Sequence, residues 1–104
     1  MKLIKILIFL LISFNLPLKT YSNTNIENIL KDGGKLIFVR HAYAPGGGDP
    51  SNFDVTDCST QRNLNEEGIV QSVNLGIFFI KNQIKVDKVL SSEWCRCKQT
   101  AEYA

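Results

Sequence analysis

Histidine is almost missing from this sequence, since His41 is the only one among 104 residues. Imidazole is the side chain most used for proton transfer near neutral pH and the commonest metal ligand. A single copy excludes a metal centre built from several imidazoles. Any imidazole chemistry of this chain therefore has to take place at residue 41.

Cysteine is scarce as well, with Cys58, Cys95 and Cys97 as the three copies. Cys-x-Cys with distant partners lacks the paired spacing of structural zinc sites, so we expect no metal. Three thiols cannot all pair within one chain. A bond between Cys95 and Cys97 would close a very tight ring, so we expect Cys58 to pair with one of them. A thiol or metal protein built on these three residues stays as an alternative.

The sequence has no apolar run of the roughly 20 residues that a membrane-spanning helix needs. Its longest run, residues 6–12, follows Lys2 and Lys5 and is followed by Pro17. This pattern predicts a secretory signal peptide over residues 1–22, with a single membrane anchor as the alternative. We expect export, to a bacterial periplasm, and no stable membrane association after cleavage.

An excess of positive charge is also lacking outside that segment. The formal charge of +2 falls to −1 without Lys2, Lys5 and Lys19, which lie in the predicted signal peptide. No basic surface is then expected, which argues against a nucleic-acid partner. A P-loop is excluded too, because no lysine with serine or threonine follows the glycines at 46–48 at the required place.

Three segments of the remaining chain have clear structural preferences. Residues 23–34 form a polar lead-in with a short helix. Residues 35–40 contain four consecutive apolar residues, which is typical of a strand covered on both faces. The glycine-rich, polar stretch 42–62 predicts a long loop, in which Phe53 and Cys58 suggest that parts are held in place.

The second half of the chain predicts two helices with a short strand between them. Asn65 can cap a helix whose first turn contains Glu66 and Glu67, and residues 81–83 close it. Its expected core-facing stripe consists of Ile69, Val73, Gly76, Ile77 and Ile80. Residues 86–90 are the second strand candidate, and Ser91 or Ser92 can cap a last helix.

The order strand, loop, helix, strand, helix indicates an α/β fold with a parallel pair of strands. Ligands of such sheets bind at the carboxyl ends of the strands, where Arg40 and His41 leave the first strand. Arg96 follows the second strand within about one turn of the helix start. Guanidinium groups and a helix N-terminus bind phosphate, and an imidazole between them can accept a phosphoryl group.

Three segments together resemble the histidine phosphatase superfamily, also called phosphoglycerate mutase-like, and within it the small exported bacterial members. They are LIFVRHA (36–42), DCSTQRNLNEEG (57–68) and VLSSEWCRCKQTA (89–101). The resemblance implies a three-layer α/β/α domain with a mainly parallel sheet. It implies that His41 becomes phosphorylated and that Arg40 and Arg96 bind the phosphate, with Arg62 as a further candidate for the pocket.

The same resemblance implies a metal-independent phosphatase that needs no cofactor and acts on a small phosphorylated substrate; a mutase is the alternative within the family. Two features depart from the family pattern. Ala42 replaces the usual glycine, which is tolerable only with ordinary backbone dihedrals. The family's second histidine is not in this chain, so we expect residues 35–104 to be the N-terminal part of a longer domain, with poor stability and little or no catalysis alone. A non-catalytic module that binds phosphate or another anion is the second candidate.

Overall fold

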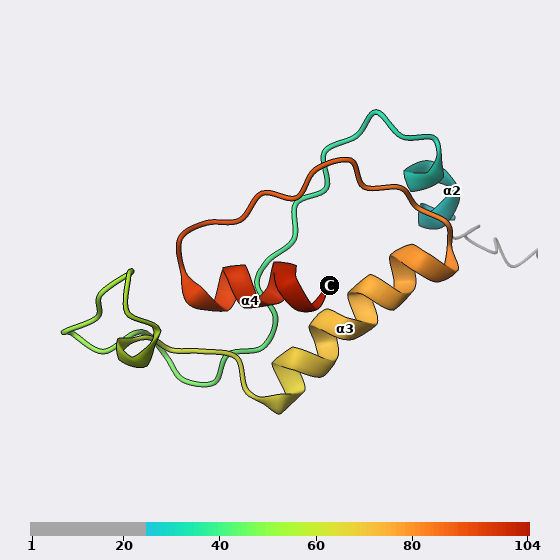
Figure 1. Ribbon diagram of the computed structural model, residues 1–104. Coiled ribbons are helices and arrows are strands. Elements are labelled where there is room, and N and C mark those ends of the chain that lie inside the picture. The colour runs from blue at the N-terminus through green and yellow to red at the C-terminus, as the bar shows by residue number, and fades with distance from the viewer. Residues whose placement is uncertain (1–24) are drawn as a thin grey trace, which may run out of the picture.

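Helices are the regular elements of the computed structural model, which describes residues 25–104 (Figure 1). They are α2 (Ile26–Lys31), the 3-10 helix η1 (Cys58–Thr60), α3 (Glu66–Lys81) and α4 (Cys95–Tyr103). The predicted signal peptide, residues 1–22, lies outside the described residues. Within 25–104, no helix has both the length and the apolar content needed to cross a bilayer.

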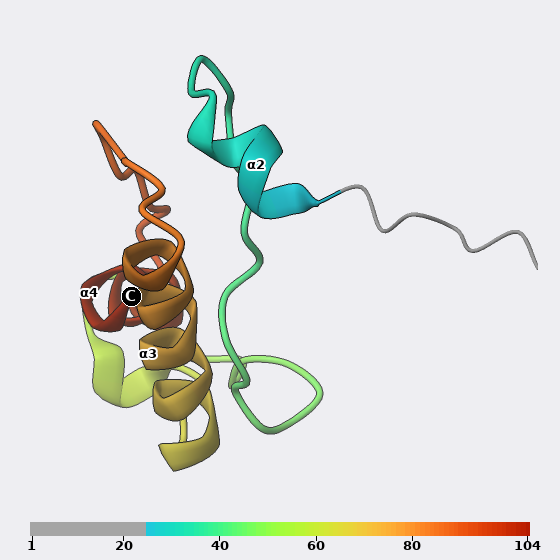
Figure 2. The same ribbon diagram turned by 90° about the vertical axis from the view of Figure 1, so that its right-hand side faces the viewer.

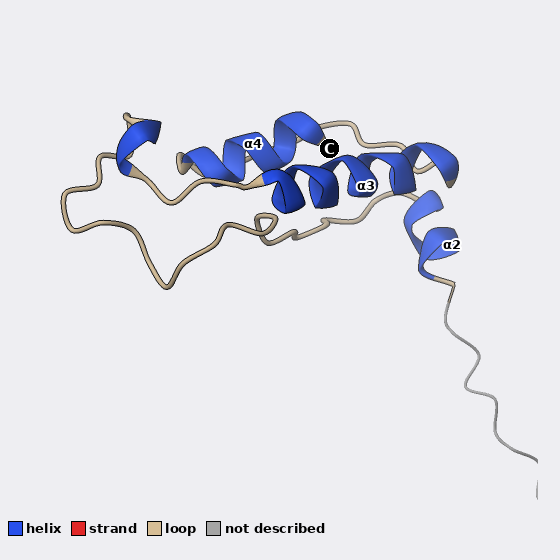
Figure 3. Cartoon of the chain, turned by 90° about the horizontal axis from the view of Figure 1, so that it is seen from below, coloured by secondary structure: helices blue, strands red, loops and turns tan. Residues whose placement is uncertain are grey.

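The predicted α/β fold with a mainly parallel sheet is wrong. The one β-bridge in residues 25–104 is isolated, antiparallel and local, between Asp54 and Asp57. Figure 3 accordingly shows helices and loops but no strand. Residues 35–40 and 86–90, the two predicted strands, belong to the loops.

The physical reason is that an apolar run favours an extended backbone but does not supply a partner. A strand needs the N–H and C=O groups of a neighbour, and the two segments run apart from one another (Figure 2). Phe38 is 91% exposed and Leu90 is 80% exposed, so neither run is covered as the sequence predicts. Such exposed apolar side chains add little to the stability of the fold.

Helix α3 forms where the sequence predicts it, and its start has a local cause. Asn65 Oδ1 accepts the Gly68 N–H at 3.0 Å, which satisfies one of the free donors of the first turn. Glu66 and Glu67 place negative charge beside those donors. Lys81 lies in the last turn, where a positive charge is favourable.

The face of α3 that is buried differs from the predicted apolar stripe. Its buried residues are Gly68, Ser72 and Gly76, spaced four apart, whereas Ile80 is 78% exposed. The small residues let other segments approach the helix closely: a Cβ at Gly68 would overlap the Tyr43 carbonyl, and one at Gly76 would overlap the Ala104 carbonyl. Close backbone approach, rather than apolar side-chain packing, therefore brings residue 43 and α4 onto α3.

Helix α4 starts later than the serine caps predict. Its N-cap is Trp94, which makes no side-chain cap hydrogen bond, and the hydroxyl of Ser91 donates to the Ser92 carbonyl instead. The N–H of Cys95, in the first turn, donates to Gln61 Oε1 at 3.0 Å. The side chain of Gln61, from a distant segment, thus accepts the hydrogen bond that a local capping side chain would accept.

The loop between residues 42 and 62 is held at several points, as Phe53 and Cys58 suggest. The Phe53 ring lies 4.9 Å from the Trp94 ring, centroid to centroid. Cys58 is joined to Cys95 by a disulfide, which ties η1 to the start of α4. These contacts fix the second half of the loop beside the first turn of α4.

Apart from the glycines of α3, few residues in the described chain are buried, and polar ones are as prominent as apolar ones. They are Ala44, Ile84 and Cys95 on the apolar side, and Gln61, Ser72, Arg96 and Thr100 on the polar side. Buried polar groups need hydrogen-bond partners to avoid a net cost. Among them, Thr100 contacts the segment that carries His41, through the Ala42 N–H.

Candidate anion-binding site

The segment after His41 is tied to both long helices. The Ala42 N–H donates to Thr100 Oγ1 on α4 at 3.0 Å, and the Tyr43 N–H donates to Gln71 Oε1 on α3 at 2.9 Å. Thr100 Oγ1 in turn donates to the Arg96 carbonyl at 2.7 Å. These bonds place His41 and Arg96, 55 positions apart in the sequence, on neighbouring parts of the fold.

The backbone at Ala42 has the ordinary dihedrals that the alanine methyl group requires. In residues 25–104 Gln83 is the one non-glycine residue with a positive φ, so Ala42 has ordinary backbone dihedrals. Alanine therefore fits here without the conformational freedom of glycine.

The ring of His41 is half-buried and has a defined hydrogen bond. Its Nδ1 lies 2.7 Å from the carbonyl oxygen of Ala42. A carbonyl oxygen only accepts, so this contact assigns the proton to Nδ1. In the neutral ring, Nε2 then carries the free lone pair.

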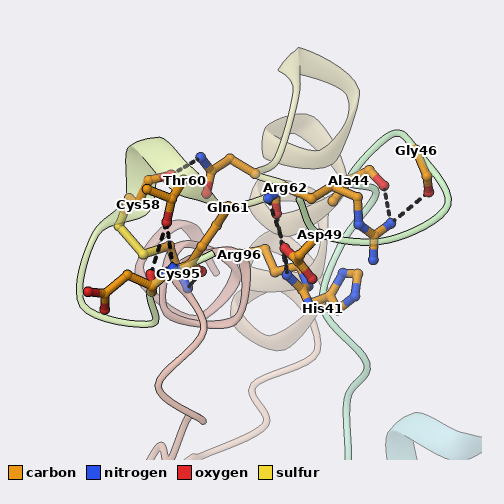
Figure 4. A network of polar contacts seen from close by, with 12 residues as sticks. His41, Ala44, Gly46, Asp49, Cys58, Thr60, Gln61, Arg62, Cys95 and Arg96 are labelled. Atoms are coloured by element: carbon orange, nitrogen blue, oxygen red, sulfur yellow. Dashed lines mark hydrogen bonds and ion pairs between the residues drawn. A yellow bond between two sulfur atoms is a disulfide. The ribbon is translucent and has the colours of Figure 1, made fainter. Parts of the chain in front are cut away.

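Arg96 is the buried cation of the site. Its residue is 9% exposed, and its guanidinium carbon lies 4.5 Å from the centre of the Trp94 ring. Its Nη1 donates to Asp49 Oδ1 at 2.9 Å. Figure 4 shows this ion pair between the loop and α4, with the side chain of His41 drawn in the same part of the fold.

Asp49 comes from the glycine-rich part of the loop and is held by two donors. Its Oδ1 accepts the backbone N–H of Arg62 at 2.9 Å as well as Arg96 Nη1. The Arg62 N–H bond, followed by the hydrogen bond and charge of Arg96, holds the pKa of Asp49 below its usual value. The carboxylate is therefore charged at neutral pH and offsets the charge of Arg96.

The other two predicted arginines are placed differently. Arg62 Nη1 donates to the carbonyls of Ala44 and Gly46, at 2.7 and 3.1 Å, so its side chain braces the loop. The Arg40 side chain is exposed and makes no polar contact with residues 25–104. The structure thus brings Arg96 toward His41, while Arg62 contributes its backbone N–H next to the site.

A hollow of about 270 Å³ lies beside His41, between the extended segment and the two long helices. It is lined by Val39, Arg40, His41, Ala42, Gln71, Ser72, Leu75 and Thr100. Arg40 is therefore the guanidinium group that borders this hollow. Its other lining residues are apolar or polar without charge, apart from the imidazole of His41, and small-molecule sites combine such side chains with a charged one.

The N-terminus of α4 offers fewer free N–H groups to an anion than the sequence predicts. The Cys95 N–H is already used by Gln61 Oε1, whose own Nε2 donates to the Asp54 carbonyl at 2.8 Å. The Cys97 and Lys98 N–H groups both donate to the Trp94 carbonyl. The Arg96 guanidinium and the Arg62 N–H are the donors that converge on the Asp49 carboxylate.

The structure pairs Cys58 with Cys95, one of the two pairings left open by the sequence, and leaves Cys97 as a free, half-buried thiol. No group of three or more metal-ligating side chains occurs in the part of the chain that the structure describes. The cysteines act there as a covalent tie between the loop and α4.

Comparisons of the chain with protein-family models, curated proteins and solved structures found no match. The resemblance to the histidine phosphatase superfamily therefore stays a prediction from the three quoted segments.

Sequence reasoning missed Asp49, Gln61 and Thr100, which organise this site. Each binds a residue far away in the sequence. Asp49 binds Arg96, 47 positions away, and Gln61 binds Cys95, 34 positions away. Thr100 binds Ala42, 58 positions away. An acidic residue directly after three glycines is the one local signal for Asp49. It indicates a carboxylate on a loop and does not name its partner.

Proposed function

We propose that this chain binds the phosphate group of a small phosphorylated molecule and transfers the phosphoryl group to His41, as a phosphatase does. One observation carries the proposal: Nδ1 of His41 is held by a backbone carbonyl, and the Thr100 hydroxyl links the Ala42 N–H to the carbonyl of the buried Arg96. The likeness of three segments to the histidine phosphatase superfamily supports it independently.

The chemistry follows from the free lone pair on Nε2. Nε2 attacks phosphorus, an N–P bond forms, and the P–O bond to the alcohol breaks, so the alcohol leaves with the electron pair and takes up a proton. Water then attacks phosphorus, the N–P bond breaks, and inorganic phosphate and the neutral imidazole are regenerated. Nδ1 keeps its proton, and the Ala42 carbonyl stabilises the positive charge that the ring carries during the transfer.

Charge supports the same reading. The guanidinium group of Arg96 pairs with Asp49, and that of Arg40 borders the hollow beside His41. Fixed positive charge is the main requirement of phosphoryl transfer. The proposal includes export of the chain to a periplasm and involves neither a metal nor nucleic acid.

The test uses p-nitrophenyl phosphate, whose leaving group departs without a proton donor. We expect slow release of p-nitrophenol by the full chain, together with a phosphohistidine signal in ³¹P NMR at neutral pH. His41→Gln should lose both signals, whereas Lys98→Gln, which removes an exposed charge of α4 that pairs with Glu93, should keep them. Equal turnover by the His41 variant would end the proposal.

The second candidate is an anion-binding module without catalysis. It is favoured by the charge-neutralising pair of Arg96 and Asp49 and by the single histidine of the chain. In the same experiment, this candidate predicts phosphate binding that Arg96→Gln weakens, with neither p-nitrophenol release nor a phosphohistidine signal.

A further inference from the structure

We propose that Asp49 is an internal competitor for the phosphate position, which an incoming phosphate displaces from Arg96 and from the backbone of Arg62. The inference rests on the proposed function, because it concerns the same site. In this proposal the Asp49 carboxylate lowers the affinity of the site for phosphate, and the Arg62 N–H donates to the bound phosphate.

The contacts of one oxygen atom define the position. Asp49 Oδ1 accepts from Arg96 Nη1 and from the Arg62 N–H, both at 2.9 Å. Two donors from segments far apart in the sequence thus converge on a single oxygen. A phosphate oxygen has the same acceptor chemistry and can take the place of Oδ1.

The carboxylate leaves part of the guanidinium group unused. Arg96 Nε is buried and has no hydrogen-bond partner within residues 25–104, while the residue as a whole is 9% exposed. A buried donor without an acceptor is costly. Guanidinium forms its strongest contacts with two parallel hydrogen bonds, and a phosphate offers enough oxygens to accept from Nε and Nη1 together.

The loop around Asp49 is built so that the carboxylate can leave. Gly46, Gly47 and Gly48 precede it and are exposed, and no atom outside the adjoining residues lies within 4 Å of a Cβ built at Gly47 or Gly48. Glycines change their backbone dihedrals at little steric cost. The loop is fixed on either side of this stretch: before it, Arg62 Nη1 binds the Ala44 and Gly46 carbonyls, and after it, Phe53 packs on Trp94 and Cys58 is disulfide-bonded.

Phosphate binding is then an exchange of anions. Asp49 moves into solvent as the glycines rearrange, and the phosphate takes over the Arg96 side chain and the Arg62 N–H. The affinity for phosphate is lowered by the free energy that the displaced carboxylate loses. Removing the charge of Asp49 while keeping an acceptor at Oδ1 should therefore tighten binding.

Trp94 offers a direct readout, since it is the only tryptophan and its ring lies against the Arg96 guanidinium. We would titrate the full chain with inorganic phosphate and follow tryptophan fluorescence, with calorimetry as a second measure of Kd. Asp49→Asn should lower Kd about three- to tenfold. The matched control Asp54→Asn removes the same charge from the same loop at a carboxylate bonded to Thr56, and should leave Kd within about twofold.

Arg96→Gln separates the two claims. If it weakens binding while Asp49→Asn leaves Kd unchanged or raises it, the competitor role is overturned and the phosphate site stands. If Arg96→Gln leaves Kd unchanged, the proposed function fails and the competitor role falls with it. Circular dichroism checks folding: loss of the helical signal in both Asp49→Asn and Asp49→Ser would make Asp49 a structural counter-ion and overturn the inference.

Discussion

The hydroxyl of Thr100 accepts the Ala42 N–H at 3.0 Å, although 58 positions separate the two residues. The same hydroxyl donates to the Arg96 carbonyl, so one buried oxygen links the His41 segment to the helix that carries Arg96. The geometry of the candidate site depends on this link.

Replacing Thr100 by valine should lower the free energy of unfolding by about 1–2 kcal/mol, because it leaves the Ala42 N–H without its acceptor. Thr100→Ser keeps the hydroxyl and should retain most of the stability. Urea unfolding followed by circular dichroism measures both variants. A valine variant as stable as the native chain would contradict the role of this hydrogen bond.

Gly68→Ala should destabilise the fold by about 1–3 kcal/mol, the range for overpacking a tight contact. The added Cβ would overlap the Tyr43 carbonyl and push the His41 segment off α3. Gly47→Ala is the matched control, since no neighbouring atom lies within 4 Å of a Cβ there and its φ is ordinary. If the two variants melt at the same temperature, the close approach at Gly68 does not hold the segment.

The disulfide between Cys58 and Cys95 closes a loop of 37 positions, which restricts the unfolded chain. By the chain-entropy relation, Cys58→Ser should cost about 3–4 kcal/mol, enough to unfold a domain of marginal stability. Cys97→Ser removes the free thiol and should leave the melting temperature nearly unchanged. Thiol titration of the denatured, unreduced chain should find one reactive thiol; finding three would contradict the pairing.

Acid should weaken the fold through Asp49. The pKa of Asp49 is lowered in the folded chain by the Arg62 N–H and by Arg96, so its stabilising contribution is complete above the unfolded value of about 3.9. The contribution is lost as the pH falls through the lowered folded pKa. Urea midpoints of the native chain and Asp49→Asn should therefore differ at neutral pH and converge in acid. A constant difference across this range would contradict the assignment.

Much of α3 could be predicted because its causes are local. The Asn65 cap, the acidic first turn and the basic last turn all lie within the helix or next to it. The start of α4 could not be predicted in the same way. Its first N–H is satisfied by Gln61, and Trp94 packs on Phe53, and both partners are distant in sequence.

The predicted strands were wrong because a strand depends on a distant partner segment, which the local sequence does not reveal. Residues 36–39 and 86–90 have the composition of strands, but pairing depends on a partner that composition does not supply.

The candidate site was predicted in part: His41 and Arg96 were found from residue chemistry and from the three quoted segments. Asp49 was missed, because an ion pair with Arg96 across 47 positions leaves no local pattern.

The central claim, that His41 and Arg96 hold one phosphate, is tested most directly by a double-mutant cycle on phosphate affinity. The cycle compares the native chain, His41→Gln, Arg96→Gln and the double variant by calorimetry. We expect each single change to weaken binding, and the double variant to lose less than the sum, with a coupling of about 0.5–3 kcal/mol. Losses that simply add, or affinities that do not change, would contradict a shared anion.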